Sequence, residues 1–253
     1  MTIRLVTFDV LHTLITPRYP IHIQYARAFE PYLGTLDPQA LKRSFGLALR
    51  QLQAEKPVYG EKGTSAWWTD VIQRTALGAG AEPQALNASL SDIVQTLMST
   101  FSTKQGYKAF DDSLPILDAL HNDLHVRTAV VSNADSRILS VLKDLAFPAY
   151  LSPILLSESE GVEKPSPEIF LRALQRVNAE LKDPITPSEC VHVGDELECD
   201  YIGARDVGMH ALLLERAGAE DQRGRGDVSG ESGESVHVVK DMHEVLEWIR
   251  ARL

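Results

Sequence analysis

The chain opens on the stretch that decides its fold, Leu5-Val6-Thr7-Phe8-Asp9-Val10-Leu11-His12-Thr13-Leu14. Its first half is apolar and β-prone, which is typical of a strand inside a parallel sheet that is covered on both faces. Asp9 follows at the carboxyl end of that strand, where open α/β sheets bind their ligands. Because a carboxylate buried beside a sheet is costly unless it has a partner, we interpret Asp9 as a nucleophile or metal ligand. The alternative is a plain cap for the following turn.

The same kind of pattern returns after residue 112, where apolar β runs alternate with helix patterns. The runs cover residues 126–131, 150–156, 190–193, 210–214 and 236–239. Ser166-Pro167-Glu168 is a strong helix start, and Asp241 is a candidate cap for the last helix. This alternation predicts an α/β fold with a doubly wound parallel sheet, a Rossmann-like core. Right-handed crossovers would bring Asp9, Ser132 and Asp195 to one edge of that sheet.

A helical segment interrupts the sheet pattern. Two prolines break the chain after the first strand, and amphipathic helix patterns follow one another from about residue 21 to 101 without a strand pattern. We therefore expect a helical cap over 17–105, inserted into a core made of 1–16 and 106–253.

Paired tryptophans in this segment are candidates for two different roles. Trp67 and Trp68 point to different faces of their helix, so we expect one in the core and the other at a domain interface. The alternative is that one of them lines a substrate pocket, for which Tyr19 and Tyr59 are further candidates.

The composition sets limits on class and partners. The 253 residues carry a formal net charge of −10, with 44% hydrophobic and 24% charged residues, as in ordinary globular proteins. Such an acidic balance argues against nucleic-acid and membrane partners. Two cysteines without zinc or C-x-x-C spacing, no leader pattern and no apolar run of membrane-spanning length predict a cytoplasmic or nuclear location. Residues 216–235 are polar, and we expect a surface loop there.

Six polar residues would meet at the sheet edge: Asp9, Ser132, Asn133, Lys164, Asp195 and Asp200. Neighbouring carboxylates raise each other's pKa unless a cation lies among them. Lys164 supplies one positive charge, and a hard divalent ion such as Mg²⁺, bound by carboxylate and carbonyl oxygens, would supply the rest. The Ser132 hydroxyl can hold an oxyanion. The set fits attack by a carboxylate on an anionic substrate.

In these motifs and their order, the chain resembles the haloacid dehalogenase (HAD) superfamily of hydrolases. The motifs are Phe8 to Leu14, Val131-Ser132-Asn133, Lys164-Pro165 and Gly194 to Asp200. The helical segment resembles the inserted cap of that family. The Trp67-Trp68 helix and the stretch from Gly203 to Met209 further resemble the subgroup called haloacid dehalogenase-like hydrolase domain-containing protein 3.

The resemblance implies a Mg²⁺-dependent, phosphatase-type hydrolase that acts on a small phosphorylated substrate, with Asp9 as its nucleophile. Lys164 would stabilise the charge of the transferred group. The residues implied for binding that group and the substrate are Ser132, Asn133 and Thr13. The residues implied for the metal site are Asp9, Leu11 through its carbonyl, Asp195 and Asp200.

Two neighbouring positions depart from the family pattern. Phosphatases of the family carry a second Asp two residues after the nucleophile, as general acid and base, and this chain has Leu11 there. Loss of such a group typically costs roughly 10²–10⁴ in rate. His12 follows, where the family usually has glycine; we interpret it as a turn residue, and a second hypothesis is that it replaces the missing acid. His192, inside a β run, is interpreted as a core histidine.

Three interpretations therefore stay open. The first is a Mg²⁺-dependent phosphatase of reduced competence. The second is a 2-haloacid dehalogenase, a branch that also lacks the second Asp and needs no metal, although its fourth motif generally lacks the pattern found here between Asp195 and Asp200. The third is a non-catalytic descendant that binds a phosphorylated ligand or another protein.

Overall fold

The computed structural model describes residues 2–216 and 236–253, and the chain divides into two compact units. The sheet unit comprises Met1–Thr16, Ala109–Ala134 and Ala146–Leu253, and the helical unit comprises Pro17–Lys108 and Asp135–Leu145. The helical unit thus combines the segment expected as a cap with a second segment that follows the Ser132 motif. The loop expected over 216–235 lies, apart from its first residue, outside the described residues.

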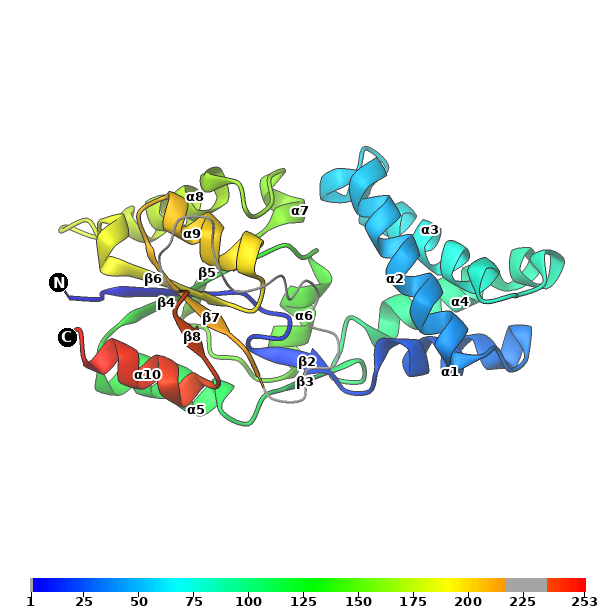
Figure 1. The fold of residues 1–253 in the computed structure, drawn as a ribbon, viewed down its shortest axis with the longest axis horizontal. Helices are drawn as coiled ribbons and strands as arrows, with labels where there is room; N and C mark the ends of the chain where they lie inside the picture. The colour runs from blue at the N-terminus through cyan, green and yellow to red at the C-terminus, as the bar shows by residue number, and fades with distance from the viewer. Residues whose placement is uncertain (1, 217–235) are drawn as a thin grey trace. The chain divides into compact units, whose positions relative to one another are not determined.

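Six parallel strands form one sheet in the order β5-β4-β1-β6-β7-β8 (Figure 1). The strands are β1 Leu5–Phe8, β4 Arg127–Ser132, β5 Leu151–Leu156, β6 Cys190–Gly194, β7 His210–Leu214 and β8 Val238–Val239. Every residue of β1 is buried, as its apolar run predicted. The order reverses beside β1, which lies between β4 and β6, and ligands of open α/β sheets bind at such a point. The predicted doubly wound α/β fold is confirmed.

Helices cover both faces of this sheet (Figure 1). On one side lie α8 (Pro167–Asn178) and α9 (Gly203–Asp206), and on the other lie α5 (Ser113–Asp118) and α10 (Met242–Arg250). Shorter turns are η2 Ala119–Asp123, α7 Ser157–Glu160 and η3 Pro187–Glu189. Both predicted caps are confirmed, because Ser166 accepts from Glu168 N and Asp241 accepts from Glu244 N.

The chain after β6 enters α9 through a turn that is wider than an α-helical one. Leu197–Ile202 forms a π-helical turn, η4, in which the backbone N–H groups of Asp200 and Tyr201 both donate to the Glu196 carbonyl, at 2.9 and 3.2 Å. This wide turn places the Asp200 carboxyl group in contact with Gly194. A side chain at position 194 would put its Cβ atom into that carboxyl group. The glycine before Asp195 is therefore needed for Asp200 to reach the site.

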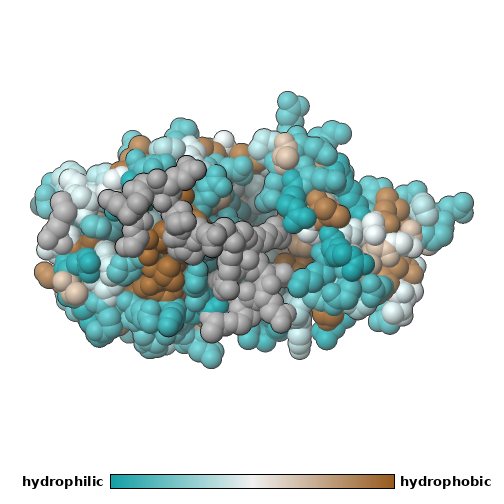
Figure 2. All heavy atoms as spheres, viewed as in Figure 1, coloured by the Kyte–Doolittle hydropathy of each residue, from teal (hydrophilic) through white to brown (hydrophobic). Residues whose placement is uncertain are grey.

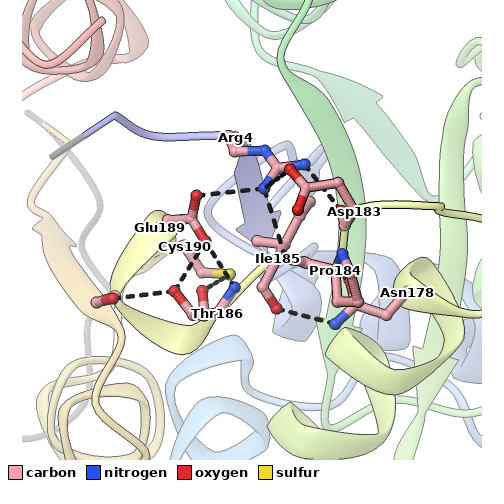
Figure 3. A network of polar contacts seen from close by, with 9 residues as sticks. Arg4, Asn178, Asp183, Pro184, Ile185, Thr186, Glu189 and Cys190 are labelled. Carbon is pink, nitrogen blue, oxygen red and sulfur yellow. Dashed lines mark hydrogen bonds and ion pairs between the residues drawn. The ribbon is translucent and has the colours of Figure 1, made fainter.

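Polar contacts hold the amino ends of β1 and β6 together (Figure 3). The Arg4 guanidinium donates to Glu189 Oε1 at 3.2 Å and to the Asp183 carbonyl at 2.9 Å, and Arg4 N donates to the Glu189 carbonyl at 2.8 Å. The Asn178 side chain, at the end of α8, bonds both backbone groups of Ile185, at 2.9 and 2.8 Å. These contacts fix the register of the two strands that carry the acids at their other ends.

The helical unit consists of α1 Ile21–Leu33, α2 Pro38–Glu55, α3 Gly63–Gly78, α4 Pro83–Thr100 and α6 Arg137–Asp144, with the short turn η1 Pro57–Tyr59. Its core contains Tyr25, Phe29, Trp67 and Ile93, all buried.

Hydrophilic residues cover most of the visible face of the molecule (Figure 2). In the described parts of the chain, no helix is both long and apolar enough to cross a membrane.

Two short strands escaped the sequence patterns. β2 (Ile15–Pro17) and β3 (Tyr107–Ala109) pair in a separate two-stranded sheet. Each has three residues and is only partly buried, so neither shows the apolar run that marks the strands of the main sheet.

Candidate active site

Three strands of the sheet unit end at one edge. Phe8, the last residue of β1, is in register with both neighbouring strands, β4 and β6. Asp9 follows, and its N–H donates to the Val193 carbonyl of β6 at 2.9 Å. Ser132 is the last residue of β4, and Asp195 directly follows β6. The convergence of these three strand ends, predicted from the alternation of strands and helices, is therefore present.

Lys164 lies between two of the carboxylates. Its Nζ donates to Asp9 Oδ1 at 2.7 Å and to Asp200 Oδ1 at 2.6 Å. The exposed fractions of the three side chains are 2% for Lys164, 11% for Asp9 and 2% for Asp200. The distance between Asp9 and Lys164 is thus that of a direct ion pair, largely out of water.

Asn133 sets the position of Lys164. Its side-chain Oδ1 accepts the Lys164 backbone N–H at 2.7 Å, and its Nδ2 donates to the Lys164 carbonyl at 2.9 Å. An amide that bonds both backbone groups of one residue fixes that backbone in place, and the motif after β4 is thereby joined to the lysine. The Asn133 side chain has this role in addition to the substrate contact that the resemblance implies for the residue.

Asp200 has all the partners that its burial requires. Besides Lys164, its Oδ1 accepts His192 Nε2 at 3.0 Å, and its Oδ2 accepts Glu196 N at 2.9 Å. The other ring nitrogen, His192 Nδ1, lies 2.8 Å from the Thr7 hydroxyl. An ionised carboxylate only accepts, so Nε2 carries the proton and Nδ1 accepts from Thr7. Burial lowers the pKa of His192, which keeps this ring neutral.

The ionisation of the trio follows from burial and pairing. Burial raises the pKa of Asp9 to about 6, although Lys164 and a hydrogen bond from Ser132 oppose the shift. Burial acts in the same direction on Asp200, but Lys164 and His192 hold its pKa below the ordinary value. For Lys164 burial favours the neutral amine, yet the two carboxylates raise its pKa. The lysine is therefore an ammonium shared by two acids.

Asp195 is the acid without such a partner. Its carboxylate has no hydrogen bond or ion pair within the described parts of the chain. Burial, together with the charges of Asp9, Asp200 and Glu196, raises the pKa of Asp195 to about 9. One ammonium thus pairs with two of the three acids, and the site has more acidic groups than cationic ones.

The donor atoms fit a hard divalent cation better than any softer metal, because they are all oxygens and their negative charge exceeds the positive. Asp200 already accepts three hydrogen bonds, so Asp9 and Asp195 are the carboxylates with remaining capacity. Within residues 2–216 and 236–253, no three His, Cys, Asp or Glu side chains are already arranged around a metal position. The ammonium of Lys164 is instead held between Asp9 and Asp200.

The two residues that differ from the family pattern, Leu11 and His12, lie in the turn after Asp9. Leu11 pairs with Ile15 in an isolated bridge. His12 has a positive φ of 64°, and its N–H donates to the Ile15 carbonyl at 2.7 Å, so it is a turn residue as expected. Thr13 is fully buried, and among the described residues its hydroxyl has no hydrogen-bond partner. The substrate contact implied for Thr13 stays a prediction.

Two residues that no motif pointed to lie in this network. His192 faces Thr7 in the register of β6 and β1, and two polar residues inside apolar runs were the available signal. The Arg216 guanidinium donates to the Thr13 carbonyl at 2.9 Å and to both carboxylate oxygens of Asp112 at 2.9 Å each. Nothing in the sequence indicated this pair, since its members are far apart along the chain.

One of the two tryptophans of the helical unit lies in the core, as expected, and the interface position expected for the other stays a prediction. Trp67 is a core residue and 5% exposed. Trp68 Nε1 donates to Asp135 Oδ2 at 2.9 Å, and the Arg137 guanidinium lies 4.6 Å from the Trp68 ring centroid while pairing with Asp135 at 2.7 Å. Trp68 also lines a small cavity within the helical unit, and the substrate pocket considered for one of the pair stays a prediction. Tyr59 packs on Trp67 instead.

Comparisons with known proteins find similar sequences over most of the chain. The family model for haloacid dehalogenase-like hydrolases matches residues 3–208. A relative from Xenopus laevis, named haloacid dehalogenase-like hydrolase domain-containing protein 3, is 33% identical over 217 residues, which cover 85% of each chain.

Solved structures share the fold. A dehalogenase in an intermediate complex matches with a TM-score of 0.70 and 17% identity, covering 98% of this chain and 97% of the other. A HAD phosphatase from Thermococcus onnurineus matches with a TM-score of 0.58 and 21% identity, covering all of both chains. At such identities the likeness concerns the fold alone.

Proposed function

We propose, from the premise that the chain belongs to the haloacid dehalogenase-like hydrolase family, that it is a phosphatase-type enzyme with Asp9 as nucleophile and Mg²⁺ as cofactor. The observation that carries the proposal is the charge imbalance around Lys164, which pairs with Asp9 and Asp200, while the Asp195 carboxylate has no hydrogen bond or ion pair among the described residues. Such a site accepts an anionic substrate only with a further cation. With a net charge of −10 the chain suits a small phosphorylated molecule better than nucleic acid.

The carboxylates of Asp9 and Asp195 and the carbonyl of Leu11 would hold the metal. Asp200 would support the site from behind, because its oxygens are committed to Lys164, His192 and Glu196. When bound, Mg²⁺ would neutralise charge on the phosphoryl oxygens.

The residues of the chain would then act in a fixed order. Lys164 holds Asp9 Oδ1, so the carboxylate is oriented and its other oxygen attacks phosphorus. The bond from phosphorus to the leaving oxygen breaks, and Ser132 donates a hydrogen bond to the transferred group. Water then attacks phosphorus, which releases inorganic phosphate and restores Asp9.

Leu11 determines which substrates react well. The leaving oxygen must take its proton from water, because a leucine side chain cannot supply one. Esters whose leaving group is a stable anion need no such proton, whereas alkyl esters do. We therefore expect the enzyme to prefer aryl phosphates, acyl phosphates or anhydrides to alkyl phosphates.

Hydrolysis of p-nitrophenyl phosphate, measured with Mg²⁺ and with EDTA for the wild type and Asp9→Asn, tests the proposal directly. We expect turnover that needs both the metal and Asp9. Turnover that persists in Asp9→Asn would rule out the assigned nucleophile.

Leu11→Asp tests the missing proton carrier. An alkyl phosphate should be hydrolysed faster by this variant than by the wild type, by roughly 10²–10⁴-fold, and p-nitrophenyl phosphate should gain less. Leu11→Asn, which has a similar shape but no titrating group, is the matched control and should give no such gain. Equal gains for both variants would mean that polarity in the turn, rather than proton transfer, limits the rate.

Leu11 itself favours a second candidate, a 2-haloacid dehalogenase. Halide release from 2-chloropropionate in EDTA, lost in Asp9→Asn, would support that activity over the phosphatase. If neither assay detects turnover while Mg²⁺ still raises the melting temperature, the non-catalytic interpretation is the one left.

A further inference from the structure

A polar hollow lies beside β7 and β8 in the sheet unit and begins at the amino end of β7. Its volume is about 400 Å³, and it is lined by Tyr201, Arg205, His210, Ala211, His237, Trp248 and Arg252. His210 is the first residue of β7, whereas the candidate catalytic acids follow the last residues of β1 and β6. In a parallel sheet these are opposite ends, so the hollow is separate from the site of Asp9.

The lining is cationic in an acidic protein. Two guanidinium groups and two imidazoles face the hollow, and none of the lining residues in the described parts of the chain is acidic, while the whole chain carries a net charge of −10. The pKa of His210 is lowered, first by burial and then by the charges of Arg252 and Arg205. The two guanidinium groups are therefore close enough to His210 to act on its ionisation.

Arg252 is held in place before any ligand arrives. Its guanidinium lies 3.8 Å from the centroid of the Trp248 ring, and its Nη1 donates to the Trp248 carbonyl at 3.0 Å. Within the described residues, that carbonyl is the one acceptor found for the Arg252 side chain, so its other N–H groups can bond an anion. A guanidinium already fixed on an aromatic face loses less freedom when it binds.

The two imidazoles are fixed as well. The rings of His210 and His237 meet the Trp248 ring at 5.4 and 6.0 Å between centroids, both edge to face. The backbone N–H of His237 donates to the Tyr201 hydroxyl at 3.1 Å. One tryptophan thus organises one guanidinium and both imidazoles around the same space.

We propose that this hollow binds a small phosphate-bearing anion with two or more negative charges. The planar fork of a guanidinium matches phosphate oxygens, and imidazoles add further donors. The volume suits a ligand larger than a simple halide, since small-molecule sites range from about 300 to 1,000 Å³. The hollow is polar and open, so an apolar ligand would gain little there.

Histidine signals in the wild-type protein give a local test with pyrophosphate as the probe. The experiment uses ¹H–¹³C NMR in EDTA and 100 mM NaCl, with the imidazole signals assigned from His210→Gln and His237→Gln. Both signals should move and saturate, whereas His121, which stacks on Tyr150 beside the opposite edge strand β5, should not move. Unmoved signals of His210 and His237 at 5 mM pyrophosphate would overturn the proposal.

A charge-matched pair of variants tests Arg252. Arg252→Gln should weaken pyrophosphate binding in the NMR titration by about tenfold or more, as expected for a lost hydrogen bond to a charged group. Arg250→Gln removes the same charge two residues away, from an exposed guanidinium paired with Glu247 at 2.9 Å, and should leave the affinity unchanged. Equal losses in both variants would mean general charge attraction and contradict a built site. Neither readout uses Asp9 or turnover, so the result is independent of the phosphatase assay.

Discussion

Ion pairs lie near both ends of β1 and β6, but those at the amino ends are exposed to water and those at the carboxyl ends are buried. At the amino ends, Arg4 pairs with Asp183 and Glu189 at 3.2 Å each, and the exposed fractions of these side chains are 30%, 87% and 22%. At the carboxyl ends, Lys164 pairs with Asp9 and Asp200 at shorter distances, and no side chain of the trio is more than 11% exposed. The same two strands therefore connect a solvated ion pair with a buried one.

This difference in exposure to water determines whether the charges at each end only stabilise the fold or can also shift pKa values. Water screens the amino-terminal charges, so they hold the strand register and little else. The carboxyl-terminal charges lie in a medium of lower dielectric, where each unpaired charge is costly and pKa values move. Reactive carboxylates need the second environment, and the first keeps the strands aligned so that the acids meet.

The largest effect should come from breaking the buried pair. Lys164→Met leaves Asp9 and Asp200 facing each other without a cation, and removing one partner of a buried ion pair typically costs about 3–5 kcal/mol. Urea unfolding at pH 7 in EDTA measures the loss of unfolding free energy. Lys182→Met, at an exposed position of the same unit, should change it by less than about 0.5 kcal/mol. A Lys164→Met protein as stable as the wild type would mean that the two acids do not carry buried charges.

Asp195 should make stability depend on pH and on metal. Its pKa is about 9 in the fold against an ordinary value of 3.8, so the folded state binds the proton more tightly and stability falls as pH rises between these values. Mg²⁺ needs the ionised form and should stabilise the protein more at pH 8 than at pH 5. At a hundredfold excess over Kd the gain is about 2.7 kcal/mol.

Melting temperatures with Mg²⁺ and with EDTA measure this linkage. Asp195→Asn should melt higher than the wild type in EDTA at pH 8 and should respond little to Mg²⁺. A Mg²⁺ response of the same size in Asp195→Asn and the wild type would place the metal elsewhere.

A smaller effect is expected from His192, which joins Thr7 to Asp200. His192→Leu leaves a buried hydroxyl and a buried carboxylate oxygen each short of a partner, at a cost of about 1–3 kcal/mol. Thr7→Val alone should cost less, and the double variant should lose less than the sum of the two, because the same chain of hydrogen bonds is broken only once. Additive losses in urea unfolding would show that Thr7 and His192 act separately.

The sequence was sufficient to predict that the three strand ends meet at one edge of the sheet. Apolar runs that stop at Asp9, Ser132 and Asp195 mark buried parallel strands, and the topology of such a sheet leaves one edge where they can meet. Lys164 was placed at the site by its motif. Its pairing with both Asp9 and Asp200, and the wide turn η4 that makes this possible, were not predictable, because a helical period says nothing of a π-helical turn.

Two other contacts could not be predicted from sequence periodicity, for a different reason. His192 and Thr7 looked like ordinary members of apolar runs until the register set them opposite each other. Arg216 lies 104 residues from Asp112 along the chain, and no periodicity relates them. Periodicity indicates which face of an element is buried, but the partner of a buried polar group depends on three-dimensional neighbours.

The smallest effect should come from the solvated end. Arg4→Met removes an ion pair with partners that water reaches, and such pairs contribute about 0–1 kcal/mol. Its cost should shrink further in 1 M NaCl, where the Debye length is about 3 Å, while the cost of Lys164→Met should change little because salt does not enter the buried trio. Urea unfolding of both variants at low and high salt measures this contrast. If the two variants lost equal stability and responded equally to salt, exposure to water would not be what separates the two ends of these strands.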